Sequence, residues 1–110
     1  MYKLVTFIPE SHLQPVKSAL FAAGAGQIGN YDHCSWQVLG AGQFRPLTGS
    51  DAFIGQTGQL EQVSEYRLET VVDNLHIEAV IRALYIAHPY QEPAYDCWRV
   101  EDFSRLKPAK

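Results

Sequence analysis

Residues 16–23 read VKSALFAA, and residues 80–87, which lie 64 positions later, read VIRALYIA. One Val, one Leu and two Ala coincide in the two stretches, and Phe21 stands opposite Tyr85. In both stretches the apolar residues recur at the three- and four-residue spacing of a helix that buries one face. The sequence therefore predicts two related helices. Ser11 can cap the first, which runs to about Ala23, and Asp73 or Asn74 caps the second, which runs to Ala87.

Strands flank both helices. Residues 2–8 are apolar and β-prone and end at Pro9, residues 64–72 alternate apolar and charged side chains, and residues 94–100 form a last strand. The order β-α-β-β-α-β duplicates one β-α-β unit. We therefore predict an α+β, ferredoxin-like fold, in which an antiparallel sheet carries two helices on one face.

All eight glycines lie between Gly24 and Gly58. We expect a glycine-rich extended insertion around residues 24–62, with short strands at 34–39 and 43–46 and a turn at Gly40 and Gly42. Residues 47–62 are expected to form a loop or a ragged hairpin. Residues 24–29 fit the G-x-G-x-x-G pattern, but they follow a helix instead of opening one. We interpret them as a helix end and not as a dinucleotide site.

Composition narrows the class of protein. The chain is 46% hydrophobic and 19% charged, which is ordinary for one globular domain, expected over residues 1–103 with a polar tail at 104–110. The net charge is -3 and the basic residues are scattered, so a nucleic-acid partner is excluded. No apolar run is long enough for a membrane span. Two cysteines without a signal peptide indicate a cytoplasmic location.

The first strand has apolar residues on both of its faces. Leu4 and Ile8 lie on one face, and Val5 and Phe7 lie on the other. A sheet face exposed to water should be polar, so we expect another surface to cover it, most simply a second copy of the chain. The alternative is that the glycine-rich loop folds back over this face.

Two segments contain side chains that could bind a ligand. Asp32, His33 and Cys34 are adjacent and include metal-ligand types, although a loop histidine beside a half-buried cysteine would have the same sequence. Residues 88–93, HPYQEP, have two prolines that stiffen the backbone around Tyr90 and Glu92. This turn either presents a binding surface or is a connector in which His88 caps the last carbonyls of the helix.

Three blocks, residues 24–36, 40–47 and 88–96, resemble the insert domain of the NGG1-interacting-factor-three-like family (YqfO type). The likeness extends over residues 2–100. That insert is similar to the PII signalling proteins and to the cation-tolerance protein CutA, which are ferredoxin-like trimers. The resemblance therefore implies a homo-oligomer, with a trimer favoured over a dimer.

The resemblance also implies a function, that of an oligomeric module which binds a small ligand or metal and acts by a binding-linked change of shape. Its candidate ligand-binding residues are Tyr31, His33, Tyr90 and Glu92, and its candidate metal ligands are His33, Cys34 and His88. The cofactor is unknown at this stage, with a divalent metal as the candidate. Full-length members have a two-metal site in flanking halves that this chain lacks, so we expect no enzyme activity from it alone.

Two alternatives stay open. The chain could be a structural interaction domain that partners a separate metal-site protein, or an enzyme acting through Cys34 and a histidine. The sequence also departs from the family where Gln91 replaces an expected Glu and where residues 50–53, SDAF, replace an Asn-Pro type of sequence. Because the basic residues of the PII nucleotide sites are missing, the resemblance gives little support to nucleotide binding.

Overall fold

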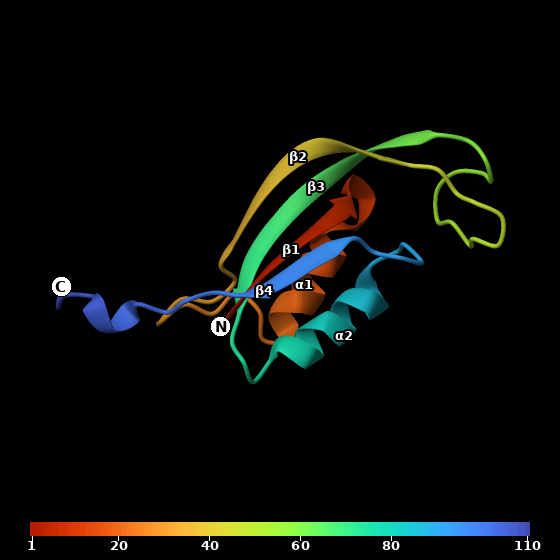
Figure 1. Cartoon of the computed structure of the whole chain (residues 1–110). Helices are drawn as coiled ribbons and strands as arrows, with labels where there is room; N and C mark the ends of the chain where they lie inside the picture. The colour runs from red at the N-terminus through yellow and green to blue at the C-terminus, as the bar shows by residue number, and fades with distance from the viewer.

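The computed structural model describes residues 1–110 and confirms the predicted fold class. Its main elements are, in chain order, β1 (Tyr2–Pro9), α1 (Leu13–Ala22), β2 (Ser35–Phe44), β3 (Glu61–Val72), α2 (Ile77–Ala87) and β4 (Tyr95–Arg99). The strands form one antiparallel sheet in the order β2-β3-β1-β4. Both helices pack on the same face of this sheet, and the C-terminal tail extends from one end of the molecule (Figure 1). No helix has the length and apolar character needed to cross a membrane.

The core lies between the sheet and the two helices. Alternate residues of β1 and β3 point into it, because successive side chains of a strand face opposite sides. The same helical stripes that the sequence repeat predicted supply the other half of the core. Its ten buried residues are Leu4, Ile8, Leu13, Val16, Leu20, Ala25, Leu68, Val72, Val80 and Leu84.

The turn predicted at Gly40 and Gly42, in the middle of the glycine-rich region, was wrong. Gly40 and Gly42 form no turn, because both lie inside the single ten-residue strand β2, opposite Glu65 and Val63 of β3. A Cβ atom on Gly42 would overlap Oε1 of Glu65. Glycine at this position lets the Glu65 side chain lie directly over the strand, and a larger residue would displace that side chain. The expected insertion is in fact two segments, 24–34 and 45–60, on either side of β2.

The end of α1 explains the G-x-G-x-x-G pattern. The N–H of Ala25 donates to the carbonyl of Leu20 at 3.0 Å, and the N–H of Gly24 donates to that of Phe21 at 3.1 Å. Gly24 has a φ of +116°, so these bonds form a Schellman motif, which closes a helix with a left-handed residue. The interpretation of this segment as a helix end is confirmed.

The side-chain cap predicted for the first helix is absent, whereas the one predicted for the second helix is present in modified form. No side chain caps α1, and the hydroxyl of Ser11 lies 2.8 Å from Nδ1 of His12 instead. The predicted cap of the second helix is present as a turn before it, where Oδ1 of Asp73 accepts the N–H groups of Leu75 and His76 at 3.0 Å each.

The sheet face opposite the helices is open. Strand pairing places Val5, Trp36 and Trp98 on this face, and the two tryptophans are 57% and 45% exposed. Among them, Glu69 accepts ion pairs from Lys3 and Arg67, both at 3.2 Å. The loop 45–60 extends past one end of the sheet (Figure 1) and leaves this face uncovered.

Candidate functional site

The predicted site residues lie at two opposite ends of the sheet (Figure 1). The carbonyl of Cys34 accepts the hydroxyl of Thr70, and the hydroxyl of Tyr90 donates to Glu65, each at 2.8 Å. Thr70 and Glu65 are five residues apart along β3, which corresponds to about 17 Å of strand. His33 and Cys34 therefore do not meet His88 within one chain. No group of three or more His, Cys, Asp or Glu side chains is placed to hold a metal ion.

The first end of the sheet has no convergent site. His33 has a φ of +55° and an exposed ring that packs 4.8 Å from the ring of Phe21. Its Nδ1 pairs with the carboxylate of Asp32 at 3.2 Å. The Cys34 thiol donates to the backbone carbonyl of Asp32 at 3.6 Å and makes no hydrogen bond to a histidine. Tyr31 is 75% exposed. The arrangement matches a loop histidine beside a half-buried cysteine.

His88, at the other end, has both ring nitrogens in contact with backbone groups. Its side chain is buried, with Nε2 2.7 Å from the carbonyl of Phe7 and Nδ1 accepting the N–H of Tyr90 at 3.1 Å. This pattern requires a neutral ring with its proton on Nε2. Both nitrogens are therefore occupied, and neither caps α2 or is free for a metal. Burial, above all, lowers the pKa of His88 from its ordinary value of 6.5.

The buried neutral ring of His88 predicts a loss of stability in mild acid. Below about pH 6.5 the unfolded chain takes up a proton that the folded chain resists, so the stabilisation present above that pH is lost as the pH falls toward the lowered folded-state pKa. Glu65 opposes this lowering and His12 adds to it. Urea unfolding at about pH 7.5 and about pH 5.5 measures the change. A H88Q variant should show a smaller dependence, and an equal dependence would contradict the assignment.

Tyr90 connects the turn to the sheet. Its hydroxyl donates to Oε2 of Glu65, and burial followed by this bond raises its pKa well above the ordinary range. The hydroxyl therefore remains a donor at physiological pH. Its ring centroid lies 4.8 Å from that of His88, so the two rings pack against each other. The Tyr90 ring is thus fixed at both its polar tip and its base.

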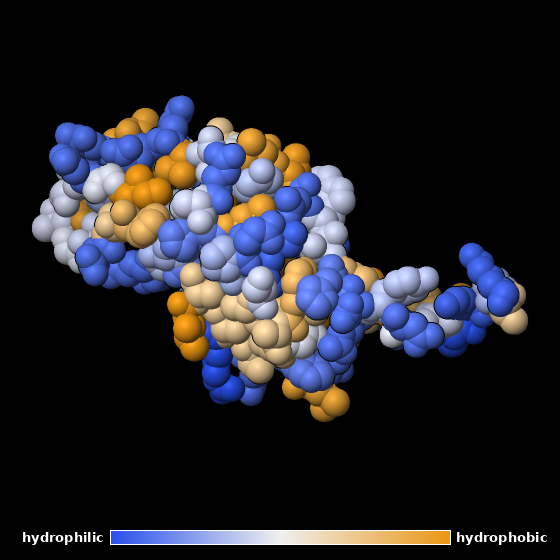
Figure 2. All heavy atoms as spheres, turned by 180° about the vertical axis from the view of Figure 1, so that it is seen from behind, coloured by the Kyte–Doolittle hydropathy of each residue, from blue (hydrophilic) through white to orange (hydrophobic).

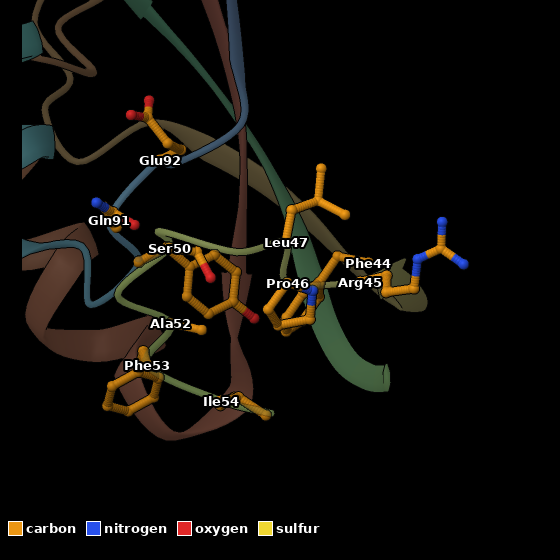
Figure 3. A pocket seen from close by; sticks show the side chains of 11 residues that line it. Phe44, Arg45, Pro46, Leu47, Ser50, Ala52, Phe53, Ile54, Gln91 and Glu92 are labelled. Atoms are coloured by element: carbon orange, nitrogen blue, oxygen red, sulfur yellow. The ribbon is translucent and has the colours of Figure 1, made fainter. Parts of the chain in front are cut away.

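A pocket of about 340 Å³ opens where the loop 45–54 packs against this turn. The backbone N–H of Asp51 donates to Oε1 of Gln91 at 2.8 Å and ties the loop to the turn. The N–H of Gly58 donates to the carbonyl of Pro46 at 2.7 Å and closes the loop on itself. The lining residues, drawn in Figure 3, are Phe44, Arg45, Pro46, Leu47, Ser50, Ala52, Phe53, Ile54, Tyr90, Gln91 and Glu92.

Two of the predicted ligand-binding residues, Tyr90 and Glu92, line this pocket. Tyr31 and His33 do not, because they precede Cys34, whose carbonyl is bonded to Thr70 at the other end of β3. The sequence analysis missed the contribution of Phe44 and Phe53. The sequence did contain a signal for this surface. Phe53 and other apolar residues occur in a segment whose pattern predicts no strand or helix that could bury them. In the structure Phe53 is 48% exposed, and hydrophobic atoms reach the surface at this end of the molecule (Figure 2).

Comparison with known proteins places the chain among longer relatives. No protein-family model matches it. It is 46% identical over 98 residues to the GTP cyclohydrolase 1 type 2 homolog of Halalkalibacterium halodurans, covering 89% of this chain and 26% of that protein. The Bacillus cereus protein related to NIF3 superposes with a TM-score of 0.78 at 42% identity, covering 92% of this chain and 26% of that one. The chain thus spans about a quarter of these relatives.

The fold also recurs in small proteins of similar length. The divalent cation tolerance protein CutA1 of Thermus thermophilus superposes with a TM-score of 0.65 at 16% identity, covering 96% of this chain and 89% of that one. At this identity the likeness concerns the fold alone. It agrees with the ferredoxin-like order of strands and helices described above.

Proposed function

We propose that this chain, the counterpart of about a quarter of the NIF3-related GTP cyclohydrolase 1 type 2 homologs, is a regulatory module that binds a small ligand. The observation that carries the proposal is the pocket between the loop 45–54 and the turn that contains Tyr90. Pockets of this kind, mostly apolar with a few polar groups, are the usual form of small-molecule sites. At about 340 Å³ it is near the lower end of their size range.

The position of the pocket suits a regulatory role. Tyr90 lines it on one side, and the Glu65 carboxylate bonded to Tyr90 lies on the open sheet face, over Gly42. A ligand that packs on the Tyr90 ring would therefore act on the geometry of this bond and on the face beyond it. A ligand shifts a conformational equilibrium only if it binds one conformation more tightly than the other. In this module the two conformations would differ in the hydrogen bond between Tyr90 and Glu65.

We further propose that the module works as a homo-oligomer assembled through the open sheet face, with a trimer as the favoured state. Exposed tryptophans and Val38 on one face form an apolar surface that water does not favour. A divalent metal, in this arrangement, would need ligands from two chains, because no single chain gathers three. Native mass spectrometry of untagged protein would report the number of subunits and any retained ligand together.

The second candidate is a structural interaction domain. The N–H of Val100 donates to the carbonyl of Met1 at 3.1 Å, so the first and last strands of the domain meet. Such adjacent ends suit a unit that joins to a larger protein, which the size of the relatives also favours. This function predicts stable association with a metal-site protein and no small ligand in the pocket.

Ligand binding is tested by a thermal-shift panel of amino acids, amines, nucleotides and divalent metals, followed by calorimetry of each hit. A ligand at 100 times its Kd should stabilise the chain by about 2.7 kcal/mol. F53A should weaken binding about tenfold, because it removes an aromatic wall of the pocket. L60A is the matched control, an exposed apolar residue of the same loop outside the lining. A folded chain that binds nothing in the panel would refute the ligand-binding proposal.

A further inference from the structure

Three aromatic rings from three separate segments meet in the pocket. Phe44 ends β2, Phe53 belongs to the loop and Tyr90 to the turn after α2. The ring centroid of Tyr90 lies 6.0 Å from that of Phe44 and 6.3 Å from that of Phe53, with interplanar angles of 52° and 46°. The rings are tilted, not stacked flat on one another, so parts of their faces remain available to a ligand (Figure 3). The face of an aromatic ring is electron-rich and attracts cations.

The hydrogen bond of Tyr90 strengthens this character. Its hydroxyl donates to the carboxylate of Glu65 at 2.8 Å. A phenol that donates to an anion gains electron density, and the negative potential over its ring increases. The hydroxyl is also already engaged by Glu65, so the ring face is the part of Tyr90 that the pocket offers to a ligand.

The charges around the rings favour a cation as well. Glu92 lines the pocket, Glu65 lies behind Tyr90, and Asp51 stands between two lining residues of the loop. The lining contains one acid, Glu92, and one base, Arg45, and Figure 3 shows both charged groups directed away from the rings. His12 packs edge-on against the outer ring, Phe53, at 5.2 Å. The charged group in direct contact with a ring residue is therefore the Glu65 carboxylate, which disfavours an anion at the rings.

We infer that the pocket binds a small organic cation, an ammonium group attached to a compact apolar body. The inference rests on the proposed ligand-binding function and names the class of ligand. The rings would contact the ammonium group or its methyl substituents, and the apolar lining from Pro46 to Ile54 would cover the body. A bare metal ion is a poorer fit, because no three potential ligand side chains converge. The small volume restricts the body to about one ring or a short branched chain.

The test compares three probes of one shape and different charge. Calorimetry at neutral pH would measure Kd for phenethylammonium, for the neutral phenethyl alcohol and for the anionic hydrocinnamate. We expect the cation to bind about tenfold more tightly than the alcohol, and the anion to bind most weakly. F53L keeps an apolar side chain but removes a ring, so it should reduce the preference for the cation and retain the alcohol. E92Q should reduce the same preference.

The control variant is E101Q, which makes the same charge change in the exposed segment after β4 and should leave all three affinities unchanged. Equal binding of cation and alcohol, or tighter binding of the anion, would overturn the inference and leave the pocket a ligand site of another class. A preference for the cation that survives F53L and E92Q would also overturn it. Failure of all three probes overturns the inference alone, since the proposed function is judged by the wider ligand panel.

Discussion

Replacing Trp36 with alanine is expected to weaken self-association by about 2–4 kcal/mol, which converts the oligomer to monomer at micromolar concentrations. Trp36 lies on the open sheet face and is 57% exposed in a single chain. Buried tryptophans contribute more than most residues to protein interfaces. Sedimentation velocity of the wild type and of W36A over a range of concentrations measures the effect, with circular dichroism to verify that the variant is folded.

The matched control is L75A. Leu75 is 90% exposed, more than Trp36, but it lies in the turn before α2 and away from the open face. It should leave the oligomer unchanged. A wild-type protein that stays monomeric, or a W36A variant that associates as well as the wild type, would show that the open face is not the contact between copies.

A second large effect is expected from G26A, which should lower the free energy of unfolding by about 3 kcal/mol. Gly26 has a φ of +81°, and a Cβ there would stand 2.9 Å from the backbone nitrogen of Cys34 and 2.9 Å from Cε1 of Phe21. The backbone cannot move away easily, because Gly26 also donates to the carbonyl of Val71 at 2.7 Å. Urea unfolding monitored by tryptophan fluorescence measures the loss.

Gly58 provides a control for the backbone conformation alone. Its φ is +80°, nearly the same as that of Gly26, yet no atom lies within 4 Å of the Cβ position. G58A should therefore cost only about 1 kcal/mol, the strain of a left-handed alanine. If the two variants lose the same stability, the close contacts of Gly26 do not contribute and the segment 24–34 is less tightly held than the structure indicates.

Local patterns were sufficient to predict most of the elements. The repeat of 16–23 in 80–87 predicted both helices, and alternation in 64–72 predicted all of β3 except its first three residues. These signals succeed because an element that buries one face must repeat its apolar residues with its own period. Gly40 and Gly42 misled the analysis, since a glycine that permits a turn and a glycine that admits the side chain of Glu65 look identical in the sequence.

The candidate site was predicted in part. Tyr90 and Glu92 were named from their place in a proline-stiffened turn, and both line the pocket. Phe44 and Phe53 were not named, because their role depends on how the loop 45–54 folds against a turn nearly forty residues further along the chain. Within one chain His33 and His88 lie at opposite ends of the sheet, so their shared role as metal ligands stays a prediction for contacts between chains.

By itself the sequence determined the fold class, the order of the elements and the apolar character of both faces of the first strand. These follow from periodicities within a few residues, which local chemistry controls. The tertiary structure decided at which end of the sheet each loop segment lies. It also decided which nitrogen of His88 carries the proton and that Tyr90 bonds to Glu65. Such features depend on contacts between residues far apart in the chain, and only the register of the strands brings those residues together.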